Sequence, residues 1–492
     1  MSNVNRRLQA GALAAAALYA LWGCGEVSDP GIGDANPDPG PADDGDIGDE
    51  DAEDPFFGVR GTIHDVYVHE DGETPVPRDL ADTTVEIFVE NDDGGFDVFS
   101  GSGAADGRFE VEDVPEGLFY IRLPDRPSVS IVEYLHTDER DLEIVTQRRV
   151  LRPDHARPTE ESTLAVDIAG LDDSNPGSNV HLTAPLQGLY VREFLSEAAS
   201  TFSEDYDILA RNERLLSEDD LYITQLAPVT RFGNSYRALE RSLLIPDLTH
   251  ADGERLEVEG ELETVEQQTL TIDARGSAFD SIVDSLCPGE LEFGSTALAG
   301  RAVPLGFDRE ATAQRIDLFE SLDVPPSNDE ITVSYGDPTP AQWEASVSAL
   351  TVCRVEGSEI VAFAEQTLAT EPLDSGTPLT PTLGPVVNIS VDGQDGQEPA
   401  VVDTETPRVT WSQPSLGSAA EYSALLGYDG NSVTIFTRED EIRVPPGVIE
   451  EGRSVTLLVT SRDYPWGTEA RRVPVPRSIA RAVFPGTITL QD

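Results

Sequence analysis

The sequence predicts a mainly β chain, with several β-sandwich domains in tandem after an N-terminal signal segment and an acidic linker. Short alternations of apolar and polar residues recur along the chain, clearest at Thr84–Val89, and this period of two is typical of half-buried strands. Glycine and proline number 41 and 35, which suits many turns. The length of 492 residues allows three or four domains at about 100–200 residues each.

Residues 1–23 predict a secretory signal peptide. Two arginines precede an uncharged, mostly apolar run over residues 8–21, which is shorter than the ~20 residues that a membrane-spanning helix needs. The ending Leu21-Trp22-Gly23-Cys24 resembles a bacterial lipobox, and this resemblance implies that Cys24 becomes the lipidated first residue of the mature protein. The alternatives are an ordinary signal peptide and an uncleaved anchor. By resemblance to lipoproteins of diderm bacteria, Gly25 after the cysteine implies export to the outer membrane, with the leaflet face left open.

Residues 24–55 are predicted to form the lipid anchor and a solvated linker. Between residues 26 and 54 there are twelve Asp or Glu, five Gly, four Pro and no basic residue, and such a segment cannot bury a core and repels itself. An EF-hand calcium loop that began at Asp34 would need Gly and Glu at its sixth and twelfth positions, where the chain has Pro39 and Gly45. We therefore expect a tether here and no metal site.

The charge balance indicates a saline environment. The chain has 92 acidic and 33 basic residues, a net charge of −59, and it contains no lysine. This charge repels itself in dilute buffer, whereas in molar salt the Debye length falls to ~3 Å. Acid-rich surfaces without lysine resemble those of salt-adapted, halophilic proteins; the alternative is a GC-rich genome that favours arginine codons. In either case a phosphate backbone would be repelled, so we expect no nucleic-acid partner.

The three cysteines are Cys24, Cys287 and Cys353. With lipid on Cys24, the other two would form a pair in an exported, disulfide-permissive compartment, and we expect a Cys287–Cys353 disulfide. This bond would close a loop of roughly 66 residues and contribute up to ~4 kcal/mol in the chain-entropy model. The alternative is two buried thiols. Neither cysteine has a neighbouring histidine or a CxxC spacing, so we expect no metal-binding or nucleophilic role.

Residues 56–158 are predicted to form the first β-sandwich. Its pieces, in order, are a valine-x-glycine opening at Val59–Ile63, an alternating strand at Thr84–Val89, a turn at Asp106–Phe109, and Val114–Gly117 ahead of an aromatic strand at 118–123. This order resembles the carboxypeptidase regulatory-like, transthyretin-like domain. The resemblance implies a structural module without catalytic residues, whose fold class overlaps with carbohydrate-binding modules. Runs at 130–134 and 142–145 would finish or extend the sandwich.

Residues 162–374 are predicted to be a central β-rich region with short helices. Strand-like runs lie at Thr163–Asp167, Val180–Leu182, Asp220–Leu226 and Thr269–Ile272. Helical spacing occurs at Leu189–Ala199 and at Ala278–Leu286, where Phe279, Ile282, Val283 and Leu286 would share a face in the core. Segments at 167–171, 236–239 and 334–343 resemble large lipoproteins of myxobacteria-like species, and no function follows from that resemblance.

A linker rich in proline and threonine, residues 375–385, precedes a last predicted β-sandwich at residues 386–492. The segment Pro407–Pro414 resembles the second strand of a fibronectin type III domain, whose tryptophan, here Trp411, packs in the core. Glu421–Tyr428 would be the next strand, and Gly452–Val459 resembles the penultimate strand of that family. The corner tyrosine of the family falls on Val455 here.

No constellation in the sequence points to catalysis or to a cofactor. The sequence has no GxSxG, HExxH or P-loop motif. Its histidines are scattered, and we expect surface or structural roles for them: His64, His69, His136, His155, His181 and His250. With 92 carboxylates, acidic pairs arise by chance and mark no glycosidase site. Exposed Trp343, Tyr464 or Trp466 could stack on sugars; the alternative is packing in a core or between domains.

We therefore expect a non-enzymatic lipoprotein that is exported and lipid-anchored at the outer membrane, with cell-surface exposure as one outcome. Its role would be structural, adhesive or envelope-organising. The main alternative is a carbohydrate-binding lipoprotein that captures polysaccharide with its first or last sandwich. A second alternative is a hydrolase in the central region. The expected partners are the membrane, through the lipid on Cys24, and a polysaccharide or an envelope protein.

Overall fold

The computed structural model confirms the prediction of a mainly β chain built of sandwiches. The residues that it describes are 31–32, 57–69, 72–123, 131–149, 156–174, 176–211, 213–287, 290–304, 315–324, 330–341, 343–355, 362–370, 378–395, 399–428, 431–463, 477–484 and 486–491.

The first unit is a sandwich in which buried and exposed residues alternate most clearly along β6. Its strands are β2 Gly58–His69, β3 Gly72–Pro77, β4 Thr84–Glu90, β5 Phe96–Gly103, β6 Arg108–Glu112, β7 Phe119–Arg122, β8 Ile131–Thr137 and β9 Asp141–Arg149. Neighbouring strands follow the order β8-β7-β4-β5-β6-β2-β9, with β3 also paired with β2. Val85 and Ile87 of β4 point into the core, as a period of two requires. Within the predicted linker, Gly31–Ile32 form β1, which pairs with β9.

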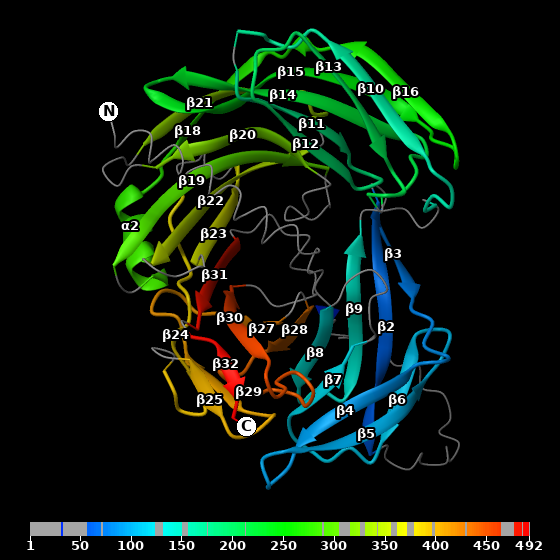
Figure 1. Cartoon of the computed structure of the whole chain (residues 1–492), viewed down its shortest axis with the longest axis vertical. Coiled ribbons are helices and arrows are strands. Elements are labelled where there is room, and N and C mark those ends of the chain that lie inside the picture. Colours follow the sequence, from blue (N-terminus) through cyan, green and yellow to red (C-terminus); the bar gives the residue numbers. More distant parts are fainter. Residues whose placement is uncertain are drawn as a thin grey trace, which may run out of the picture.

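The central unit contains one long, curved sheet. Its elements are β10 Thr163–Ala169, β11 Ser178–Ala184, β12 Leu189–Leu195, β13 Thr201–Asp207, β14 Asp219–Arg231, β15 Asn234–Leu248, β16 Arg255–Glu261, β17 Glu263–Thr264, β18 Gln267–Ile272, α2 Gly276–Leu286, β19 Leu291–Val303, β20 Ile316–Asp323, β21 Ile331–Gly336, β22 Glu344–Val355 and β23 Ala362–Ala369. The main sheet has the order β12-β11-β14-β15-β20-β19-β22-β23 and arches over the upper part of Figure 1. A second sheet, β13-β10-β16, packs on its outer face.

One predicted helix of the central unit is confirmed and the other is wrong. Helix α2 buries Phe279, Ile282, Val283 and Leu286, the stripe that the spacing predicted. The segment 189–199 contains a strand instead, β12, because its residues pair with β11 from Leu189 opposite Ala184 to Leu195 opposite Ser178. Hydrogen bonding to a neighbouring strand overrides helical spacing in a short apolar run, which periodicity alone cannot assign.

The last unit is a second sandwich. Its strands are β24 Val387–Val391, β25 Ala400–Val402, β26 Arg408–Ser412, β27 Glu421–Tyr428, β28 Asn431–Thr437, β29 Glu441–Arg443, β30 Ser454–Arg462, β31 Arg477–Val483 and β32 Ile488–Leu490. The sheet β24-β26-β29 faces the ladder β28-β27-β30-β31. Trp411 on β26 is buried, and its ring centroid lies 5.5 Å from that of Tyr422. The tryptophan therefore packs in the core, as the resemblance to fibronectin type III implied.

Two strand pairings join the three units. Strand β23 pairs antiparallel with β31, and β28 pairs in parallel with β8 from Ser432 opposite Ile131 to Thr437 opposite His136. Figure 1 shows β28 and β8 side by side, so the last sandwich continues the sheet of the first. The cores are continuous as well, since Tyr120 of the first unit packs with Trp411 and its neighbours. The first and last sandwiches therefore share a sheet and a core.

Candidate functional site

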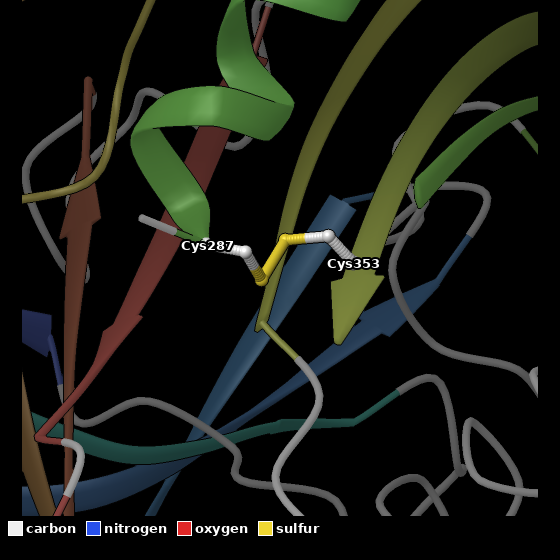
Figure 2. Close-up of a disulfide and its surroundings, with 2 residues drawn as sticks. All are labelled: Cys287 and Cys353. Atoms are coloured by element: carbon white, nitrogen blue, oxygen red, sulfur yellow. A yellow bond between two sulfur atoms is a disulfide. The ribbon is translucent and has the colours of Figure 1, made fainter. Parts of the chain in front are cut away.

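The structure joins Cys287 to Cys353, while Cys24 lies outside the described residues. The disulfide links the residue after α2 to β22, with the two Cα atoms 6.2 Å apart (Figure 2). Both cysteines are buried, in a small apolar cluster that also contains Ala364 of β23 and Ala480 of β31. The bond therefore lies close to the strands that join the central unit to the last one.

The predicted aromatic candidates do not form a shared site in the described structure. Trp343 is half-buried and packs on Tyr222, with ring centroids 5.3 Å apart. Tyr464 and Trp466 lie outside the described residues, as does the acidic stretch at 34–46. Within the described ranges, no cluster of three or more His, Cys, Asp or Glu residues is arranged to bind a metal ion. No helix in those ranges is both long and apolar enough to span a membrane.

A cluster of buried charged side chains lies on the inner face of the main sheet, opposite the face that packs on β10. His181 of β11 places Nδ1 3.3 Å from a carboxylate oxygen of Asp317 on β20. The hydroxyl of Tyr190 on β12 donates a hydrogen bond to the same oxygen at 2.9 Å. The other oxygen lies 3.3 Å from Nε of Arg315 and 3.8 Å from Nε of Arg301. This carboxylate of β20 thus contacts side chains of β11, β12 and β19.

A second carboxylate, Glu320, extends the cluster toward the β12 edge. One of its oxygens accepts hydrogen bonds from Nδ2 of Asn179 at 2.5 Å and from Arg192 at 2.7 Å. Arg237 lies 3.6 Å from the same oxygen. On the far side, Arg301 reaches Glu365 of β23 at 3.3 Å. The cluster therefore crosses the sheet from β12 to β23.

A β-bulge in β20 puts both carboxylates on one face. Gly300 of β19 pairs with Phe319, whereas the next residue, Arg301, pairs with Asp317, so β20 carries one extra residue here. Asp317 and Glu320, three apart, can then point the same way. The bulge requires glycine at position 300, because a Cβ there would come within 2.2 Å of the Phe319 ring.

The arginines keep Asp317 ionised. Burial by itself would raise the pKa of this carboxyl, but the charge of Arg315 and the contacts with His181 and Arg301 outweigh it, and the pKa lies well below its usual range. Taken together, Arg192, Arg237, Arg301 and Arg315 face Asp317, Glu320 and Glu365. The cluster is therefore close to neutral, within a chain of net charge −59.

This arrangement can lock the strands of the sheet in register. The groups gathered around His181 are a carboxylate, a phenol and guanidinium groups, whereas acyl transfer needs a hydroxyl or thiol nucleophile within reach of the imidazole. Buried ion pairs of this kind fix register more than they add stability.

The sequence signal for this cluster was weak. In β11 the polar residues Asn179, His181 and Thr183 alternate with apolar ones, which marks a strand with one polar face. Nothing in the sequence showed that this face would be buried, or that Asp317 would lie opposite His181. Of the six histidines, the structure buries His64, His136, His181 and His250; His155 and the side chain of His69 lie outside the described residues.

No protein-family model matches the chain, and no curated protein matches it. Among solved structures, it is similar to a Streptococcal ancillary pilin at 11% identity, covering 60% of this chain and 88% of that one, with a TM-score of 0.14. It is also similar to a tetra-tandem repeat in the extending region of a large adhesion protein, at 12% identity, with 87% and 99% covered and a TM-score of 0.14. The FN1–FN3 domains of chicken CNTN1 match at 9% identity, with 62% and 91% covered and a TM-score of 0.14. At these TM-scores the likenesses carry no argument about function.

Proposed function

We propose that this protein is a non-enzymatic lipoprotein of the cell surface with a structural or adhesive role, anchored to the outer membrane through lipid on Cys24. The observation that carries this proposal is the parallel pairing of β8 with β28. This pairing joins the first and last sandwiches into one body with a continuous sheet, although the residues in contact there, His136 and Thr437, are 301 positions apart in the sequence. A body of this kind holds its surfaces in a fixed orientation, which scaffolding and adhesion require.

The remaining parts of the chain fit this role. Residues 24–55, of which Gly31–Ile32 pair with β9, would act as a self-repelling tether that holds the three units, 56–158, 162–374 and 386–492, away from the membrane. Residues 375–385 would connect the second unit to the third. The buried charges of the central sheet neutralise one another, which favours a rigid support over a reaction centre.

The anchor is tested by the intact mass of protein extracted from the membranes of the cells that make it. The N-terminal peptide should begin at Cys24 and carry fatty-acyl mass, and Cys24→Ala should move the protein to the soluble fraction. Proteolysis of whole cells should cleave the wild-type chain. An unmodified terminus at another residue, or full protection in intact cells that becomes cleavage after lysis, would contradict the proposal.

The role is tested by comparing attachment and envelope integrity in cells that lack the protein, in cells with the wild-type chain, and in cells with an Arg443→Met chain. Arg443 lies at the junction of the first and last sandwiches, so this variant loosens their fixed orientation and leaves the anchor intact. We expect a defect in the deletion strain that the wild type restores and the variant restores less well. Equal behaviour of all three strains would argue against a structural or adhesive role.

A further inference from the structure

The turn between β14 and β15 carries an unusual residue. Arg231 pairs with Asn234, so Phe232 and Gly233 form a two-residue turn, and both have left-handed φ values, 53° and 83°. Turns of this type favour Asn-Gly. Of the seven described non-glycine residues with positive φ, the other six are Asp, Asn, Glu or Ser. A bulky side chain is strained in this conformation.

Burial does not compensate for the strain. Phe232 is 62% exposed, so its ring gains little from packing in the fold. Strain that the fold leaves unexplained is a recognised mark of a functional position. The ring is also placed at the tip of a hairpin whose strands have 13 and 15 residues, where a partner can reach it.

A second exposed ring lies on β12 of the same sheet. Phe194 of β12 is 59% exposed, and the guanidinium of Arg237 lies 5.8 Å from its ring centroid. Arg237 is held in turn by the carbonyl of Gly177 at 3.0 Å and by Glu320 at 3.6 Å. The contact with a fixed arginine holds the ring in place while more than half of its surface stays open.

Two hydroxyls lie next to the turn that carries Phe232. Thr230 and Ser235 are exposed, lie opposite each other on β14 and β15, and have hydroxyl oxygens 3.1 Å apart. Because side chains two apart share a face of a strand, Ser235 and Arg237 point to the same side. We call Phe194, Arg237, Thr230, Ser235 and Phe232 the hairpin strip. Along β14 the strip extends for about 13 Å, from Pro228, which lies opposite Arg237, to the turn at Phe232.

We propose that the hairpin strip binds a neutral polysaccharide chain. Phe194 and Phe232 stack on sugar rings, since the electron-rich face of an aromatic ring attracts the C–H groups of a sugar face. The hydroxyls of Thr230 and Ser235 and the N–H groups of Arg237 bond to sugar hydroxyls. An entirely apolar partner would remove water from the remaining donors and acceptors of these groups without replacing it, at a cost. The proposal rests on the surface role proposed above and names its ligand class.

The charges favour a neutral ligand over an acidic one. Arg237 shares Glu320 with Arg192, so the strip carries at most one positive charge. The chain as a whole carries −59, which repels polyanions at low salt. A neutral glycan is not repelled by this charge.

The test measures retention of the full chain in affinity gels that contain mannan, dextran or soluble xylan, with hyaluronan as the acidic comparison. Phe232→Asn introduces the favoured Asn-Gly turn, so we expect a higher melting temperature. Because the variant loses the aromatic ring, we expect at least tenfold weaker binding to the glycan that retains the wild type. Phe194→Thr should weaken binding by a similar factor. Phe57→Asn, which removes an exposed ring of the first unit, is the matched control and should bind as the wild type does.

Three results would overturn the proposal: no retention of the wild type by any neutral glycan, retention only by hyaluronan or by a phenyl resin, and binding that Phe232→Asn leaves unchanged. Surface cleavage of whole cells separates this proposal from the surface role itself. If the chain is membrane-bound and cleaved on intact cells but binds no neutral glycan, the proposed ligand is wrong and the surface role is unaffected. A chain that binds glycan and is protected in intact cells would contradict the surface role alone.

Discussion

Nδ1 of His136 lies 3.0 Å from the hydroxyl oxygen of Thr437, and the two residues are opposite each other where β8 of the first sandwich meets β28 of the last. The imidazole also stacks on Tyr120, with ring centroids 4.1 Å apart and an angle of 12° between the planes. A titratable ring is thus enclosed in the junction that joins the two ends of the fold.

This enclosure predicts loss of stability in mild acid. Burial lowers the pKa of His136 from 6.5 to about 4, with Glu441 opposing in part. As the pH falls, the unfolded chain binds a proton at His136 before the folded chain does. The neutral imidazole therefore contributes fully to the free energy of unfolding above pH 6.5, and this contribution is lost as the pH falls toward about 4. The loss amounts to roughly 3 kcal/mol. His64, whose pKa is also lowered by burial, adds to it. We would measure the free energy of unfolding by urea titration in molar NaCl at several pH values between 7.5 and 4.5. The free energy should fall less with pH in His136→Gln than in the wild type. An equal fall in both proteins would show that His136 is not the cause of the acid sensitivity.

Arg443 is expected to be a main polar contributor to the same junction. Its backbone N–H donates to the hydroxyl of Tyr120 at 2.8 Å, and its guanidinium reaches Glu90 at 3.1 Å and the carbonyl of Gly94 at 3.0 Å. Arg443→Met should lower the free energy of unfolding by about 1–3 kcal/mol, since partly buried acceptors lose a charged donor. Arg408→Met, which removes an exposed pair with Glu441, should cost less than about 1 kcal/mol. Equal losses in urea titrations would show that the junction has no special role.

Removing the charge of Asp317 should be among the most damaging single changes in the central unit. Asp317→Asn leaves Arg315 and Arg301 without the carboxylate that they share, and uncompensated buried charge costs about 3–5 kcal/mol. Asp205→Asn breaks an exposed pair with Arg255 and should cost at most about 1 kcal/mol. Calorimetry of both variants in molar salt makes the comparison. A small effect of Asp317→Asn would mean that water reaches the cluster.

The disulfide predicts a measurable loss on its removal. The double variant Cys287→Ser/Cys353→Ser should unfold at lower denaturant, with a loss of up to ~4 kcal/mol for a loop of this length. Denatured wild-type protein should take up alkyl groups at Cys287 and Cys353 only after reduction. Alkylation without a reductant would show free thiols in place of the bond.

High salt should stabilise the chain. With a net charge of −59, repulsion weakens the compact state in dilute buffer and is screened in molar NaCl. We expect the melting temperature to climb between these conditions. A flat or falling curve would favour the codon-bias origin of the arginines.

The sequence predicted local structure better than contacts between distant segments. Alternation located β4 and helical spacing located α2, because each pattern reports a nearby buried face; β27 followed from the resemblance to fibronectin type III. The same reasoning misassigned β12, whose conformation depends on pairing with β11. The charged cluster escaped prediction for a related reason: a bulge beside Gly300 turns Asp317 and Glu320 to one face, and bulges leave no reliable periodic signal. The position of Phe232 could have been noticed, since Phe-Gly replaces the usual Asn-Gly between two strand-like runs.

The pairing of β8 with β28 also has a consequence for how the chain is made. Strand β8 leaves the ribosome about 300 residues before its partner, so its edge stays open while the central unit is still emerging. Contacts this distant in sequence form late and slowly, and an open strand edge invites pairing with other chains. If the chain is exported as proposed above, its secretion should therefore depend on periplasmic chaperones, most strongly when export stalls within the central unit.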